Sequence, residues 1–208
     1  MNMNTTDSAT VESLRPVWRG VLAASYQALE RTVAGVRDGQ EDNVTPCSQW
    51  SVTQVIQHAA GDQLAYAMKL GVGNGPAYDP FAPSGTVDGT AAGLVKEAVE
   101  QTAAAWATVS DDTATVPTPL PHGDLPTPVA AVMCALDAAV HAWDIAVATG
   151  QPSPLDDELA GHLLAAARGI VEPLRQWGAY AAVVEADGAP SATPVVDELL
   201  RYLGREPR

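Results

Sequence analysis

Apolar residues recur at steps of three and four along most of the chain, the spacing of helices that bury one face. Ser51 is expected to cap the second helix, Pro128 to begin the fourth and Gly150 to end it. Pro16 falls early in this region, where a helix tolerates a proline or begins. The pattern therefore predicts a mainly all-α fold, a bundle of four helices over residues 10–39, 51–71, 90–109 and 128–149.

The chain after Gly150 shows a different pattern. The elements expected there are a helix, a short strand, a turn and a closing helix, over residues 155–177, 181–185, 187–193 and 194–203. We therefore expect two parts. A four-helix bundle spans residues 9–152, and a small C-terminal α/β extension spans residues 153–208 and packs on the bundle.

Two connections rich in Gly and Pro interrupt the bundle pattern. Residues 71–89 cannot form a regular element, and a long irregular loop inside a compact domain is often functional. We interpret this loop as a lid or a pocket wall. Residues 110–127 hold four prolines and are expected to form an extended connector or a small hairpin that helps to shape a pocket mouth. Residues 1–8 are expected to form a disordered lead.

Composition narrows the class of protein. The formal net charge is −14, whereas a nucleic-acid or anionic-membrane partner would require a basic face, so we expect neither partner. Apolar residues make up 47% of the chain but form no run that approaches bilayer length, and residues 1–10 lack the regions of a signal peptide. Cys47 and Cys134 are too few for a disulfide framework. These features predict a soluble, cytoplasmic protein with two reduced thiols.

Polar residues at helical spacing occur in the last bundle helix, within ALDAAVHAWDIAVATG, residues 135–150. Asp137, His141 and Asp144 fall at i, i+4 and i+7, which places all three on one face of the helix. The residues between them are mostly apolar, so this face is expected to look inward, where an unpaired charge is costly. A divalent metal is one partner that would satisfy these side chains. A simple hydrogen-bonded Asp–His pair is the alternative that the spacing leaves open.

A third metal ligand would come from another helix. His58 lies at the edge of the apolar stripe of the second expected helix. With Asp137 and His141 it would form a set of two imidazoles and one carboxylate, which suits catalytic zinc and also nickel, iron or manganese. Asp144 is expected to orient an imidazole or to anchor nearby backbone, although the spacing also allows it to replace Asp137 as the ligand.

Four other residues carry weaker signals. His122 lies in the proline-rich connector and His162 on a later helix, and both are expected to be solvated. Trp50 and Trp143 flank the proposed site in sequence. Core packing is the expected role of both, because large aromatic side chains usually serve burial.

Three stretches carry a resemblance to a known family. Residues 45–63, TPCSQWSVTQVIQHAAGDQ, resemble a turn, a Trp and a helix that ends in a metal-binding His. Residues 135–152, ALDAAVHAWDIAVATGQP, resemble a signature of an acid, His, Trp-Asp, Ala and Gly at fixed spacing. Residues 197–207, DELLRYLGREP, are similar to a C-terminal ending of the same proteins. The family is the actinobacterial branch of the DinB-like superfamily, near the mycothiol-dependent maleylpyruvate isomerase N-terminal domain family.

The resemblance implies an up-down-down-up four-helix bundle with a metal at one end. By position it implies His58 as the second-helix ligand, Asp137 as the acidic ligand and His141 as the fourth-helix ligand. In the isomerase group the acidic ligand is typically Glu, so the shorter Asp would hold the ion closer to its helix or more weakly. Lys69 and Lys96 are the only lysines, and this scarcity of basic residues argues against a dicarboxylate substrate such as maleylpyruvate.

The resemblance also implies chemistry with a low-molecular-weight thiol such as mycothiol. The expected function is that of a metal-dependent S-transferase or isomerase, in which the bound ion activates the thiol toward a small electrophilic substrate. Two alternatives are a metal-dependent hydrolase that activates water and a non-catalytic binding or stress protein of the same fold. Bundles of this type often pair through an exposed helix face, which makes a homodimer the oligomer to consider.

Overall fold

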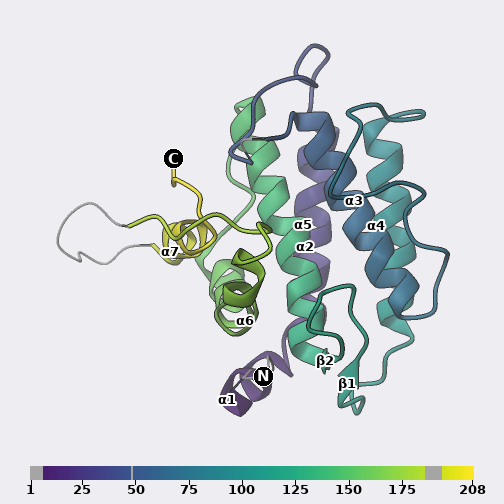
Figure 1. Cartoon of the computed structure of the whole chain (residues 1–208), viewed down its shortest axis with the longest axis vertical. Helices are drawn as coiled ribbons and strands as arrows, with labels where there is room; N and C mark the ends of the chain where they lie inside the picture. The colour runs from purple at the N-terminus through teal and green to yellow at the C-terminus, as the bar shows by residue number, and fades with distance from the viewer. Residues whose placement is uncertain (1–6, 48, 186–193) are drawn as a thin grey trace.

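Four long helices form the bundle in the computed structural model, which describes residues 7–47, 49–185 and 194–208 (Figure 1). In chain order they are α2 (Trp18–Ala34), α3 (Val52–Lys69), α4 (Ala91–Ala107) and α5 (Thr127–Thr149). Helix α5 packs against α2 and α3, and α4 packs against the same two helices from the other side. Helices α2 and α5 run upward in Figure 1 while α3 and α4 run downward, so the expected up-down-down-up bundle is confirmed.

Helix α5 is the most buried helix of the bundle. Nearly all of its residues are buried, and Asp137 is one of the few that keep some exposure. By length and composition this helix is apolar enough to cross a membrane, so the sequence-based statement that no run approaches that length is wrong. Because 94% of its most apolar window is buried inside the molecule, packing accounts for that composition. Gly150 ends the helix in the left-handed conformation, with φ of 71°, as expected.

The first expected helix is divided into two. Helix α1 (Ser8–Leu14) ends before Pro16, and α2 begins after it at Trp18. A proline lacks the N–H group that would continue the hydrogen-bond ladder, and its ring crowds the preceding turn. The prediction of one continuous helix through Pro16 is therefore wrong, and the expected end near Gly39 lies beyond the observed end of α2 at Ala34.

Helix α3 begins at a capping box, as the sequence indicates. The Ser51 hydroxyl accepts a hydrogen bond from the backbone of Gln54, and the Gln54 side chain accepts one from the backbone of Ser51. This cap fixes the start of the helix two turns before His58. The predicted hairpin in the proline-rich connector is also present, because β1 (Thr115–Val116) pairs antiparallel with β2 (Leu125–Pro126).

The C-terminal extension consists of two helices and the segments that join them. Helix α6 (Asp157–Arg175) packs on α5, and α7 (Val195–Tyr202) packs on α6. The expected strand at 181–185 is not formed. A strand needs a partner, and the backbone hydrogen bond recorded for this segment runs from the Val184 N–H group to the Arg201 carbonyl, near the end of α7. The expected turn at 187–193 and most of the expected lead at 1–8 lie outside the described residues.

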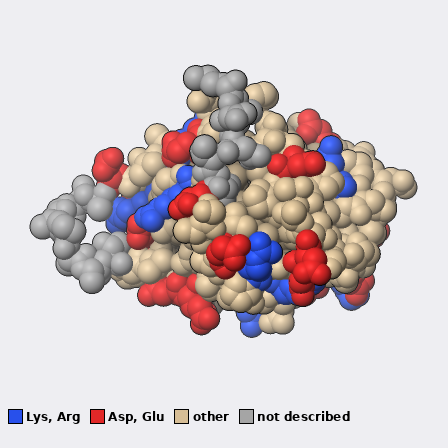
Figure 2. Space-filling model, turned by 90° about the horizontal axis from the view of Figure 1, so that it is seen from below, with Lys and Arg blue, Asp and Glu red and all other residues tan. Residues whose placement is uncertain are grey.

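Acidic side chains dominate the charged surface. Figure 2 shows Asp and Glu in several separate groups on one face, with Lys and Arg next to some of them. The sequence holds 25 acidic residues and 11 Lys and Arg. This distribution favours solubility and works against the close approach of polyanions.

Candidate metal centre

His58, Asp137 and His141 lie together where α3 packs on α5. The Nε2 atoms of both histidines are 3.4 Å from the same atom, Asp137 Oδ1. The ligand atoms of the three residues fall within 4.8 Å of one another. The side chains are only 8% exposed for His58, 14% for Asp137 and 9% for His141. The structure thus brings together the three residues that the sequence predicts as a ligand set.

Each histidine is oriented through its other ring nitrogen. The Nδ1 atom of His58 lies 2.9 Å from the Pro80 carbonyl oxygen, and the Nδ1 atom of His141 lies 3.0 Å from Asp144 Oδ2. A carbonyl or carboxylate oxygen only accepts, so both Nδ1 atoms donate. In the neutral form of each ring the Nε2 lone pair is then available to a metal, as in most metal-binding histidines.

The loop between α3 and α4 supplies the oxygen that orients His58. Gly61 makes the close approach of this loop feasible, because a Cβ atom there would lie 2.8 Å from Cγ of Pro80. The Tyr78 hydroxyl then donates to the Gln57 carbonyl at 2.7 Å and holds the loop against the helix. These contacts hold part of the loop against the helix that carries His58, and Phe81 of the same loop lines the cavity.

The donor set fits a divalent ion. Asp137 Oδ2 is buried and has no hydrogen-bond partner in the part of the chain that the structure describes, which is costly for a carboxylate oxygen. Tetrahedral zinc with bonds near 2.0–2.1 Å separates its ligand atoms by roughly 3.3 Å. The two observed separations of 3.4 Å are close to this spacing. Two imidazoles and one carboxylate also leave coordination positions for a further ligand.

Electrostatics within the triad favour an ionised carboxylate beside a protonated imidazole when no cation is bound. Burial by itself would lower the pKa of His141, but the charge of Asp137 and hydrogen bonds to Asp137 and Asp144 outweigh burial and raise that pKa to about 10. Burial would raise the pKa of Asp137, yet the two histidines hold it well below its usual range. A metal ion would take the place of the proton that the carboxylate attracts.

Asp144 is held outside the triad by Arg205. The Arg205 guanidinium donates from Nε to Oδ1 at 2.9 Å and from Nη2 to Oδ2 at 2.7 Å, while the latter oxygen also accepts from His141. Both Asp144 oxygens are therefore occupied by the guanidinium and the imidazole. This geometry favours Asp137 over Asp144 as the acidic ligand and gives Asp144 the orienting role that the sequence indicates.

A cavity of about 520 Å³ opens onto the triad. The two loops expected at the pocket mouth contribute Phe81 and residues 119–121 to its lining. The C-terminal extension closes the other side with residues 177–181 and 203–205. The cavity is large enough for a small organic molecule, and its lining combines apolar side chains with the polar groups of the triad.

Sequence reasoning missed Asp62 and Arg205 as residues of the site. Asp62 lies one turn after His58 on α3 and lines the cavity. Burial and the nearby charge of Asp137 raise the pKa of Asp62 well above its usual value. Its spacing of four residues from His58 is a signal that the sequence already carries. The approach of Arg205 has no comparable local signal, because it depends on the path of the whole extension.

The structure also shows where the two tryptophans and the two other histidines singled out in the sequence lie. Trp143 is a buried core residue, as expected, whereas Trp50 lies at the site with its ring centroid 4.6 Å from that of His58. His162 is half-buried on α6, away from the triad. His122 also lies outside the triad, but its ring nitrogens are enclosed, without a hydrogen-bond partner among the described residues, so the expectation of a solvated ring is wrong.

Fold and site together define a class: a helical-bundle protein whose buried His/Asp/His triad can hold a divalent metal at the floor of a cavity. Comparison with known proteins gives the family. The family described as the mycothiol maleylpyruvate isomerase N-terminal domain matches residues 22–146, more than half of the chain, and the chain belongs to this family. Helices α2 to α5, with every residue of the triad, fall almost entirely within the matched region.

Relatives extend the likeness over most of the chain. Uncharacterized proteins from two strains of Mycobacterium tuberculosis are 34% identical over 189 residues, which covers 88% of this chain and 95% of each relative. These relatives carry no described activity from which a function could be transferred. No solved structure matches the chain.

Proposed function

We propose that the protein is a metal-dependent enzyme of small-molecule thiol chemistry, of the S-transferase or isomerase type, with mycothiol or a similar thiol as its co-substrate. The observation that supports this most strongly is the convergence of His58 Nε2 and His141 Nε2 on one oxygen of Asp137 at the floor of a cavity. Membership of a family described by a mycothiol-dependent isomerase supports the thiol.

The residues of the chain have separate roles in this proposal. His58, Asp137 and His141 would hold the ion, for which zinc is the first choice and nickel, iron or manganese the alternatives. A divalent ion held there would lower the pKa of a bound thiol, which would make a thiolate nucleophile available at neutral pH. Asp144, fixed by Arg205, keeps the His141 ring in place.

Asp62 is a carboxyl group placed to hold a proton beside the reacting molecules. It lines the same cavity as the triad, and burial favours its protonated form. A neutral carboxylic acid in a partly closed cavity can donate a hydrogen bond to an oxygen of the substrate and can later take part in proton transfer. The loops and the extension line this end of the cavity, and partial shielding from bulk water would strengthen such interactions.

Cobalt substitution tests the proposal. Cobalt(II) is loaded into the protein, and a small thiol is added while the near-ultraviolet spectrum is followed. A thiolate bound to the ion gives a sulfur-to-cobalt charge-transfer absorption, which the proposal predicts at neutral pH. The matching alcohol serves as the ligand control, because it has the same shape and no sulfur. The Asp137→Asn variant serves as the protein control and is expected to lose the absorption.

The outcomes separate the proposal from its main competitor. Absorption that saturates with the thiol and is absent with the alcohol supports thiol activation. A cobalt spectrum that changes with pH but not with any thiol would overturn the proposal, since a hydrolase that activates water would behave in that way.

A further inference from the structure

Two aromatic side chains stand exposed at the rim of the cavity. Trp177 is 70% exposed and Phe81 is 66% exposed, although both line the cavity that contains the triad. Large aromatic rings usually gain stability from burial, so rings left open beside a site are candidates for contact with a ligand. They come from two different parts of the chain, Phe81 from the loop between α3 and α4 and Trp177 from the segment after α6.

Backbone hydrogen bonds hold the Trp177 segment in a defined turn. The Trp177 and Ala179 N–H groups both donate to the Leu174 carbonyl, at 3.1 and 3.3 Å. The Arg175 side chain donates to the carbonyls of Ala181 and Tyr202, which ties the turn to the end of α7. The exposed indole is therefore presented by a braced segment.

The Phe81 ring is positioned in a comparable way. The Asp79 carboxylate accepts from the Phe81 N–H group at 2.9 Å, and the Phe81 ring meets the His58 ring edge-on at a centroid distance of 5.3 Å. The aromatic rim thus reaches from solvent down to one of the histidines of the triad. A flat group bound between the rim and the triad would contact ring surface along this path.

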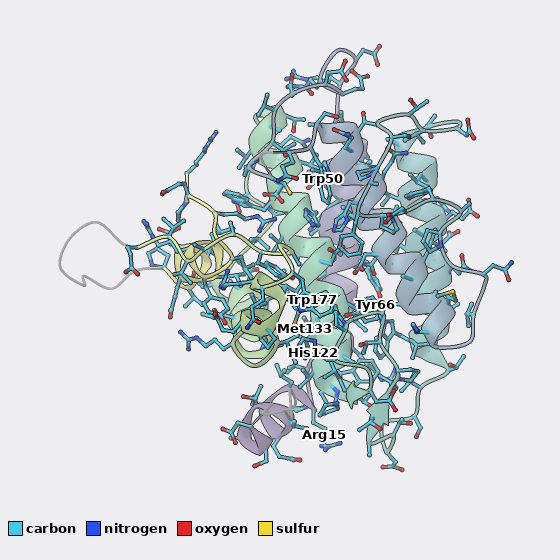
Figure 3. The ribbon with its side chains drawn as sticks, viewed as in Figure 1. Arg15, Trp50, Tyr66, His122, Met133 and Trp177 are labelled. Atoms are coloured by element: carbon cyan, nitrogen blue, oxygen red, sulfur yellow. The ribbon has the colours of Figure 1, made fainter. Side chains whose placement is uncertain are left out.

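The cavity wall beneath the rim is mainly apolar. Ala65 and Met133 contribute from the bundle, Leu120 from the hairpin and Leu174 from α6. Trp177, Met133 and Tyr66, which are labelled in Figure 3, all line this cavity. Such a wall favours the apolar part of a small molecule over a charged part.

Among the described residues that line the cavity, none outside the triad offers a free cation. Besides the two histidines of the triad, Arg205 is the one basic side chain there, and its guanidinium is committed to both oxygens of Asp144. The other ionisable side chains of this lining outside the triad, Cys47, Asp62, Tyr66 and Tyr180, carry no positive charge in either protonation state. A substrate anion would therefore meet the metal site without any further positive partner.

From these observations we infer that the substrate carries a flat apolar group, which binds at the aromatic rim of Trp177 and Phe81. This group bears no negative charge. Trp177 is then a specificity-determining residue. This inference rests on the proposed function, because it assigns the substrate class of the same site. It excludes small dicarboxylates as the preferred substrates.

Fluorine NMR titration with two probes of the same shape tests this inference. The neutral probe is para-fluorophenyl methyl sulfone, and the anionic probe is para-fluorobenzenesulfonate, both weak ligands for metals. The neutral probe is expected to bind roughly tenfold or more tightly than the anion, with and without a chelator present. Trp177→Ala is expected to weaken binding of the neutral probe by roughly three- to tenfold. Trp177→Phe should restore most of it.

The control variant is Val44→Ala, which removes an exposed apolar side chain that does not line the cavity, and binding should be unchanged. Equal binding of the two probes, or an unchanged affinity in Trp177→Ala, would overturn the inference. The titration needs neither metal nor turnover, so its result stands apart from the cobalt experiment. If only the cobalt–thiol absorption is absent, the proposed function is overturned, whereas the fluorine NMR titration still tests which substrate group the cavity binds.

Discussion

The Arg205 guanidinium, near the C-terminus, binds both carboxylate oxygens of Asp144 in the C-terminal part of the core helix α5. Asp144 is fully buried, and one of its oxygens also accepts from His141. Burial alone would lower the pKa of Arg205, but the charge of Asp144 outweighs burial and raises it. The end of the chain thereby fixes the ring of a proposed metal ligand that lies far away in sequence.

Removal of Arg205 should destabilise the protein strongly. Arg205→Leu leaves the Asp144 carboxylate buried without its main partner, which typically costs about 3–5 kcal/mol when one member of a buried ion pair is removed. Urea unfolding in the presence of a chelator measures this cost. The double variant Asp144→Leu with Arg205→Leu should recover a large part of the lost stability, because no buried charge is then left unpaired. A single variant as stable as the parent protein would show that the pair does not anchor the extension.

Stability of the metal-free protein should fall as the pH rises through neutrality. The pKa of His141 is raised to about 10 when folded, against about 6.5 for an unfolded chain. A raised pKa contributes stability that is complete below about pH 6.5 and is lost as the pH climbs toward the folded value. Urea unfolding with a chelator, between about pH 6.5 and 8.5, should show a loss of up to about 1.4 kcal/mol per pH unit.

The buried carboxylates give the opposite pH dependence, because their contribution to stability is lost at acid pH. The pKa values of Asp137 and Asp144 are held below their usual range, so their contribution is present above about pH 3.9 and is lost as the pH falls further. His141→Asn should remove the loss above about pH 6.5 without removing the acid limb of Asp144. Stability that stays constant between about pH 6.5 and 8.5 in the parent protein would contradict the charge assignment of the triad.

The two cysteines should differ in reactivity. Cys134 is fully buried and donates to the Gln63 side chain at 3.1 Å, and burial raises the pKa of its thiol. Cys47 is half-buried and lines the cavity, although burial raises its pKa as well. A disulfide reagent at neutral pH should therefore modify Cys47 slowly in the native protein and reach Cys134 only after denaturation.

A filled cavity should protect the more reactive thiol. The neutral sulfone probe is expected to slow the modification of Cys47, and Cys47→Ser should abolish native-state modification altogether. Modification of both cysteines at equal rates in the native protein would show that the core around Cys134 opens readily.

Helical periodicity was enough to place most of the candidate site. The spacing of Asp137, His141 and Asp144 is a local property of one helix, and such spacing survives whatever the helix packs against. The clear apolar stripe of its helix and the family resemblance together predict His58 as the third ligand. The caps at Ser51 and Gly150 were equally local and are confirmed.

Features that depend on partners distant in sequence could not be predicted in this way. Arg205 reaches Asp144 across 61 positions, and only the packing of the extension on α5 brings the two together. The stretch 181–185 has the composition of a strand but finds no neighbouring strand in the described structure. Pro16 is a local signal for a break between α1 and α2, but the strong apolar period on both sides of it favoured one continuous helix.

Metal content is the measurement that tests the central claim most directly. Elemental analysis of the purified protein is expected to show about one equivalent of a divalent metal per chain. His141→Ala should lose it while circular dichroism stays nearly unchanged, because the bundle core is built from apolar contacts across four helices. His162→Ala, which alters a histidine on α6 outside the triad, should keep the full equivalent. A His141→Ala variant that still carries a full equivalent of metal would contradict the account.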